Sequence, residues 1–160
     1  MTDTQHTDTV HRIVEWFRTA KPEPTVKNIL TQLGCHLEEV EEMISALDNA
    51  DSDLAYELRQ ASDELKSIDV DKYATEVQAM MSEWDKVELL DSLCDQIVTA
   101  IGTAYDFGFD IEGALKEVIA SNESKFEDGK PVFDENMKII KGKNYFKPDL
   151  TKYVGTTHEK

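Results

Sequence analysis

The stretch that decides the fold is TVKNILTQLGCHLEEVEEMISAL, residues 25–47. Apolar side chains recur along it every three or four residues, which is the repeat of an amphipathic α-helix with one apolar stripe. The stripe consists of Ile29, Leu33, Leu37, Val40, Ile44 and Leu47. Thr25 stands just before the repeat and is a suitable N-cap residue. The stretch therefore predicts a long helix whose apolar stripe faces a core.

Breaks and caps divide the rest of the chain into further helices. Pro22 and Pro24 end a first apolar repeat, Gly108 is a typical helix stop, and Asp110 is a suitable cap for the helix that follows. The sequence predicts these further helices at about residues 10–17, 54–65, 71–107 (one helix or two in tandem) and 111–119.

The helical pattern ends after Phe126. Asp128-Gly129 and Lys141-Gly142 are typical of turns, and residues 131–133 are suited to a small hairpin with residues 138–140. We therefore expect an all-α bundle of four or five helices, one domain over residues 1–160. Its core covers about residues 8–126, and an irregular tail covers residues 127–160.

Composition limits the classes of protein. A chain of 160 residues with 40% hydrophobic residues is long enough for one domain with a core. The net charge of −16 argues against binding a nucleic-acid polymer, which needs a broad basic face. The N-terminus does not read as a signal peptide, and no apolar run is long enough to cross a membrane. Two cysteines give no disulfide framework, so we expect a cytoplasmic protein.

Much of the negative charge lies in two clusters. Residues 38–95 hold 18 acidic residues against 4 basic ones. In the first cluster the spacing of three and four places three glutamates on one helix face, whereas Glu41 points away from that face. The second cluster has the same spacing on a later helix. The two sets are Glu38, Glu39 and Glu42, and Glu88, Asp91 and Asp95.

Both clusters border apolar stripes, so packing of the two stripes would bring the carboxylates together. Their repulsion would then favour a divalent cation such as Mg²⁺, which prefers oxygen ligands. Two other interpretations compete. A solvated acidic surface would suit a non-catalytic adaptor or binding protein, whereas a di-iron carboxylate bundle needs a Glu-x-x-His pairing that this sequence lacks.

Glu38-Glu39-x-x-Glu42 resembles the EExxE motif of the all-α nucleoside triphosphate pyrophosphohydrolases, the MazG and phosphoribosyl-ATP pyrophosphohydrolase superfamily. The family's second motif, ExxD, stands about thirteen residues before a helix-ending glycine, and Asp95 stands thirteen residues before Gly108. Here the chain departs from the family pattern, because Ser92 occupies the position of the motif glutamate. Glu88-x-x-Asp91 fits the motif literally but lies farther from Gly108, so two registers stay open.

The tail also resembles that of small MazG-like proteins, in Ser121-Asn122, Lys125-Phe126, and residues 141–150, KGKNYFKPDL. The resemblance covers about residues 25–150. It implies a Mg²⁺-dependent enzyme, with Mn²⁺ able to substitute, that cleaves a (d)NTP into the monophosphate and pyrophosphate by attack of water.

The resemblance assigns a role to each site residue. Metal ligands are Glu39, Glu42, Asp91 and Asp95, with Glu88 as an outer contributor. Glu38 or Glu39 holds or deprotonates the attacking water. The residues expected to contact the nucleotide are Gln32, His36, Asn122, Lys125, Lys141 and Tyr145. The resemblance also implies a homodimer or a tetramer made of two dimers.

Overall fold

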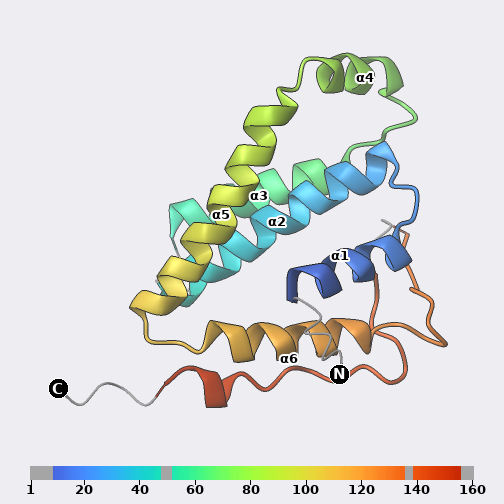
Figure 1. Cartoon of the computed structure of the whole chain (residues 1–160). Helices are drawn as coiled ribbons and strands as arrows, with labels where there is room; N and C mark the ends of the chain where they lie inside the picture. The colour runs from blue at the N-terminus through green and yellow to red at the C-terminus, as the bar shows by residue number, and fades with distance from the viewer. Residues whose placement is uncertain (1–8, 48–51, 136–138, 156–160) are drawn as a thin grey trace, which may run out of the picture. The chain divides into compact units, whose positions relative to one another are not determined.

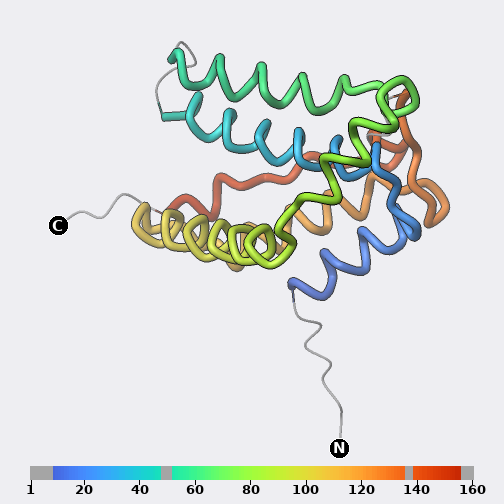
Figure 2. The backbone as a smooth tube through the Cα atoms, turned by 90° about the horizontal axis from the view of Figure 1, so that it is seen from above, coloured from blue at the N-terminus to red at the C-terminus, as the bar shows by residue number. Residues whose placement is uncertain are grey.

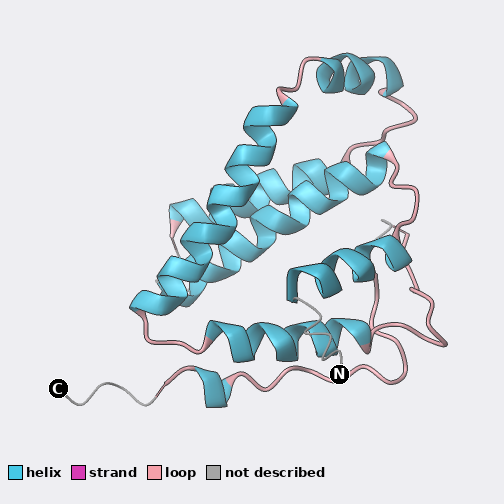
Figure 3. Ribbon diagram, viewed as in Figure 1, coloured by secondary structure: helices cyan, strands magenta, loops and turns pink. Residues whose placement is uncertain are grey.

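The computed structural model describes residues 9–47, 52–135 and 139–155, and within them it is all-α, as expected. These residues form six α-helices and one 3₁₀ turn, so the expected count of four or five helices was too low (Figures 1 and 3). No strand longer than an isolated bridge occurs in the described part. No described helix has the length and apolarity that crossing a membrane requires.

The chain divides into two compact units. The first consists of Met1–Ala20, Glu83–Val132 and Ile140–Lys160, and the second of Lys21–Ser82 and Phe133–Ile139. We describe each unit by itself, and the expectation of one domain over residues 1–160 stays a prediction.

The second unit is built on a helical hairpin, α2 (Val26–Leu47) against α3 (Asp53–Ser67), which lie side by side (Figures 1 and 2). α2 begins with the expected cap, because the Thr25 Oγ1 accepts a hydrogen bond from the Asn28 amide at 3.2 Å and the Asn28 Oδ1 accepts one from the Thr25 amide at 2.9 Å. This reciprocal pair satisfies two amides that the first helical turn leaves open. α4 (Ala74–Ser82) follows.

Small residues bring the two helices of the hairpin close together. The Ser62 hydroxyl donates to the Gly34 carbonyl at 2.8 Å, and a Cβ on Gly34 would lie 2.7 Å from Cγ of Lys66. Leu30 of α2 and Ala55 of α3 are fully buried. Only glycine at position 34 leaves room for the backbone of α3 and the side chain of Lys66 to come this close to α2.

The face of α2 that is buried differs from the predicted one. Leu30, Thr31, Gly34 and Glu41 are buried, whereas the predicted stripe is half-buried and Leu47 is 63% exposed. On α3, Ala55 and Ser62 are buried while Leu54 is 51% exposed. The reason is that the hairpin packs through its small residues, which allow the closest backbone approach.

The first unit contains α1 (Thr9–Ala20), α5 (Lys86–Asp106) and α6 (Ile111–Glu123). Residues 71–107, which the sequence predicted to form one helix or two, form two. The second of them, α5, begins after the cap residue Asp85, whose side chain accepts hydrogen bonds from the amides of Val87 and Glu88. α5 ends just before Gly108, whose φ is 73°, and the amides of Gly108 and Phe109 donate to the carbonyls of Tyr105 and Ala104. Asp110 then caps α6 through the Gly113 amide, as expected.

Trp16 of α1 packs against the end of α6 and the residues that follow it. The Trp16 ring stacks on Phe126 at 5.4 Å, and its Nε1 donates to the Asn122 carbonyl at 2.9 Å. Arg12 adds an ion pair to Glu123 at 2.8 Å. These contacts give Trp16 a structural role in this unit.

The tail is irregular, as predicted, and it follows α6 back to its start (Figure 1). The Ser121 hydroxyl donates to the Phe146 carbonyl at 2.7 Å, and the Asp110 amide donates to the carbonyl of Tyr153 at 2.8 Å, beside the 3₁₀ turn η1 (Thr151–Tyr153). Asp128 and Gly129 both have positive φ, which makes the predicted turn. A bridge joins Phe133 to Ile139, so part of the predicted hairpin forms, while its residue Lys138 lies outside the described residues.

Candidate functional site

The glutamates of α2 divide into two kinds. Glu41 is buried, and its Oε1 accepts hydrogen bonds from the Arg59 guanidinium and from the Ser45 hydroxyl. The hydrogen bond from Arg59 has the largest effect on the pKa of Glu41 and the bond from Ser45 the next largest. Both lower this pKa, and together they outweigh burial, which raises it. Glu38 lies one turn earlier, and its Oε2 is 2.8 Å from the Lys66 Nζ. Two ion pairs thus tie α2 to α3.

The other two glutamates of the motif, Glu39 and Glu42, are exposed. They are three residues apart on one face of α2, outside the face that packs on α3. The side chain of Glu42 makes no hydrogen bond or ion pair within the described chain. These are the two glutamates of the motif that the resemblance assigns to metal binding.

Gln32 and His36 lie on the same side of α2, toward its N-terminus, and both are exposed. The structure adds Lys21, which the sequence alone did not single out. Its Nζ donates to the Gln32 Oε1 at 3.1 Å. Burial lowers the pKa of Lys21, and the nearby Cys35 thiol opposes this shift. This end of α2 therefore combines a cation, an amide and an imidazole beside the exposed glutamates.

The second acidic cluster lies on the first half of α5. Glu88, Asp91 and Asp95 are exposed, and their carboxylates have no hydrogen-bond or ion-pair partner in the described part of the chain. Both registers of the second motif thus place their acids on accessible helix surface. The structure gives no reason to prefer one register, so both remain open.

The predicted nucleotide contacts of the tail gather at the end of α6. A Cβ on Gly142 would lie 2.6 Å from the Lys125 carbonyl, so the tail crosses directly over the residue after α6. The Lys141 Nζ lies 4.9 Å from the centre of the Tyr145 ring, and the Tyr145 amide donates to Gly142. Asn122, Lys125, Lys141 and Tyr145 therefore form a local group in the first unit.

The candidate metal ligands are divided between the two units. Glu39 and Glu42 belong to the second unit, and Glu88, Asp91 and Asp95 to the first. Within the described residues, no group of three or more His, Cys, Asp or Glu side chains stands ready to hold an ion. The chemistry of the donors nevertheless suits Mg²⁺ or Mn²⁺, because every candidate supplies carboxylate oxygens.

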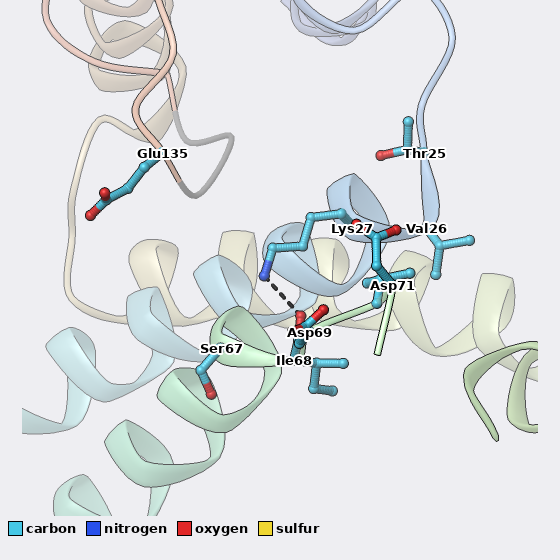
Figure 4. Close-up of a pocket in the computed structure, with 9 residues that line it drawn as sticks. Thr25, Val26, Lys27, Ser67, Ile68, Asp69, Asp71 and Glu135 are labelled. Carbon is cyan, nitrogen blue, oxygen red and sulfur yellow. Dashed lines mark hydrogen bonds between the residues drawn. The ribbon is translucent and has the colours of Figure 1, made fainter. Parts of the chain in front are cut away.

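A hollow of about 580 Å³ lies in the second unit between the start of α2 and the end of α3 (Figure 4). The Lys27 Nζ points into this region and donates to the carbonyls of Lys66 and Ile68, the latter at 3.1 Å. A lysine in this position satisfies the open carbonyls at the C-terminus of α3. None of the predicted site residues lines the hollow, and Lys27 has a structural role there.

Comparisons with known proteins give no match, whether to a family model, to a curated protein or to a solved structure.

Proposed function

We propose that this protein is a Mg²⁺-dependent nucleoside triphosphate pyrophosphohydrolase of the MazG-like class. One observation carries the proposal: the pattern of pairing among the acids. Glu41, which occupies a variable position of the motif, is buried and paired with Arg59, whereas Glu42, Glu88, Asp91 and Asp95 are exposed without side-chain partners in the described chain. These four are among the five carboxylates that the resemblance assigns to a metal, and the fold does not use them in contacts between described side chains.

The reaction would convert a (d)NTP and water into the monophosphate and pyrophosphate. A water oxygen forms a bond to phosphorus at the α–β anhydride, the bridging P–O bond breaks, and the proton from water passes to Glu38 or Glu39. Bound Mg²⁺, held by Glu39, Glu42, Asp91 and Asp95 with Glu88 beyond them, would neutralise the phosphates and polarise a phosphoryl oxygen. No side chain has to act as a nucleophile.

The remaining site residues would bind the nucleotide. Lys125 and Lys141 would contact the phosphates, as would the amide of Asn122, while Tyr145 offers a ring next to Lys141. Gln32 and His36 would contact the substrate from α2. We expect this chemistry in the cytoplasm, where (d)NTPs and Mg²⁺ are both present.

We also propose a homodimer or a tetramer made of two dimers. The apolar face of α5, defined by Leu90, Leu93, Ile97 and Ile101, is between 36% and 64% exposed. Large exposed apolar surfaces of this kind are typical of interfaces between subunits.

The proposal is tested by incubating the protein with a panel of (d)NTPs and Mg²⁺ and identifying the products by phosphorus NMR. We expect pyrophosphate and the monophosphate, and no turnover when the metal is chelated. Products consisting of diphosphate and inorganic phosphate would contradict the proposal. No turnover with any nucleotide would favour the non-catalytic acidic binding protein instead.

A further inference from the structure

Residues 141–146 of the tail, KGKNYF, form a turn that is held against residues 121–127, at the end of α6 and just beyond it. Both segments lie in the first unit. Within the turn the Tyr145 amide donates to the Gly142 carbonyl at 3.1 Å. The turn brings two of the proposed nucleotide contacts together, since the Lys141 Nζ lies 4.9 Å from the centre of the Tyr145 ring. The arrangement of these two side chains therefore depends on what holds the turn.

Glu127 contacts the turn at two successive residues. Its Oε1 accepts a hydrogen bond from the Lys143 amide at 2.9 Å, and its Oε2 lies 3.7 Å from the Lys143 Nζ. A Cβ on Gly142 would lie 2.8 Å from the Glu127 Cγ and 2.6 Å from the Lys125 carbonyl, so the stem of Glu127 packs directly on Gly142. The Lys143 side chain is 86% exposed, and such an ion pair contributes little. The hydrogen bond to the backbone amide is therefore the main restraint.

A second anchor separates this turn from the rest of the tail. The Phe146 amide donates to the Ser124 Oγ at 3.1 Å, and the Phe146 carbonyl accepts from the hydroxyl of the buried Ser121 at 2.7 Å. Only beyond this point does Glu117 hold the Asp149 amide. Because Phe146 is fixed through both of its backbone groups, release of the tail at Asp149 should not reach the turn.

We infer that Glu127 is a positioning residue, which holds residues 141–145 so that Lys141 and Tyr145 are presented to the nucleotide in one fixed arrangement. This inference rests on the proposed function, in which those two side chains contact the nucleotide. Glu127 acts through the backbone of the turn and is not itself a contact. Ordering the turn before the nucleotide arrives reduces the conformational freedom that binding would otherwise remove. Glu127 should therefore affect binding of the nucleotide more than the chemical step.

The decisive variant is Glu127→Ala, assayed with Mg²⁺ and the (d)NTP that the wild type hydrolyses best. We expect KM to rise about tenfold while kcat stays within about threefold, because binding common to the ground and transition states is lost. Glu127→Gln should keep KM within about threefold of the wild type, since its amide oxygen can still accept from the Lys143 amide although the charge is gone. An equal rise of KM in Glu127→Gln and Glu127→Ala would overturn the inference.

Glu117→Ala is the matched control. Glu117 is also a carboxylate that holds a tail amide and pairs with a lysine, Lys152, but it acts beyond the second anchor. Per folded molecule, its KM should stay within about threefold of the wild type, with the folded fraction measured by circular dichroism. Should Glu127→Ala not fold, Gly142→Ala replaces it, because its Cβ would push the turn away from the Lys125 carbonyl, and the same rise of KM is expected.

A mutant cycle separates positioning from a general loss of structure. Once Lys141→Met and Tyr145→Ala have together raised KM, adding Glu127→Ala should raise it no further. The inference is overturned if KM rises tenfold again, if Glu127→Ala keeps the wild-type KM, or if Glu117→Ala raises KM equally. It also fails if removing Lys141 and Tyr145 leaves KM unchanged. In each of these cases wild-type turnover would leave the proposed function standing, whereas an inactive wild type would remove both.

Discussion

At the scale of single residues, the buried carboxylate of Glu41 stabilises the hairpin of α2 and α3 only while its partners are present. A buried carboxylate is costly unless it is hydrogen-bonded, and Arg59 and Ser45 supply those bonds. Removing only the arginine leaves the carboxylate buried with one partner. We therefore expect Arg59→Met to lower the melting temperature by roughly 3–6 °C at pH 7, measured by circular dichroism. The double variant Glu41→Gln with Arg59→Met should recover part of this loss, and a further drop would contradict this explanation.

The lowered pKa of Glu41 predicts that the stability of the folded chain depends on pH. The pKa of Glu41 is lower in the folded chain than its ordinary value of 4.5, chiefly because of Arg59. The unfolded chain therefore takes up a proton at a higher pH than the folded chain does. The contribution of Glu41 to stability is complete above about pH 4.5 and is lost as the pH falls through its folded pKa. Melting curves from pH 6 to pH 3 should show a smaller acid-induced loss in Arg59→Met than in the wild type, and equal losses would argue against this role.

At the scale of elements, one carboxylate of α6 makes several of the contacts that hold the tail. Glu117 accepts hydrogen bonds from the Asp149 amide at 2.7 Å and from the Tyr153 hydroxyl at 3.0 Å, and its ion pair with Lys152 is 2.6 Å long. Lys152 above all, and then the Asp149 amide, lower the pKa of Glu117. Three residues of the tail therefore contact this one side chain.

We predict that Glu117→Ala will speed amide hydrogen exchange at Asp149 and Tyr153 while the hairpin of α2 and α3 exchanges as in the wild type. Local release of the tail is the reason, since each unit opens according to its own contacts. Lys116→Ala, an exposed neighbour on α6, is the control and should change neither amide. Unchanged exchange at Asp149 in Glu117→Ala would show that other contacts hold the tail.

The elements also show what a sequence can predict. Helix ends were foreseen at Thr25, Gly108 and Asp110, because caps depend on residues three or four positions away. The buried face of α2 was not, because it is set by Ser62 and Lys66, which lie far along the chain. The EExxE spacing likewise identified Glu38, Glu39 and Glu42, but it did not indicate that Lys66 would pair with Glu38 or that Arg59 would pair with the neighbouring Glu41.

At the scale of the whole molecule, the apolar face of α5 predicts self-association. We expect light scattering at micromolar concentration to give two or four times the chain mass of 18.2 kDa. Ile97→Glu should lower that mass, because it places a charge in the middle of the face. Leu54→Glu, at a similarly exposed apolar residue of α3, should leave it unchanged. A wild type that is monomeric under these conditions would contradict the proposed assembly.

We propose that hydrolysis of nucleoside triphosphates by this protein depends on Mg²⁺ and on the exposed acids of α2 and α5. The most direct test is the rate of pyrophosphate release by the wild type, Glu42→Ala, Asp95→Ala and the exposed control Glu64→Ala, each with Mg²⁺ and the best (d)NTP. We predict that both site variants lose on the order of 10²- to 10³-fold in rate, while Glu64→Ala stays near the wild type. Without Mg²⁺, each site variant should melt at or slightly above the wild-type temperature, because a repulsive charge has gone. Near-normal pyrophosphate release by Glu42→Ala or by Asp95→Ala, or none by the wild type, would contradict the account.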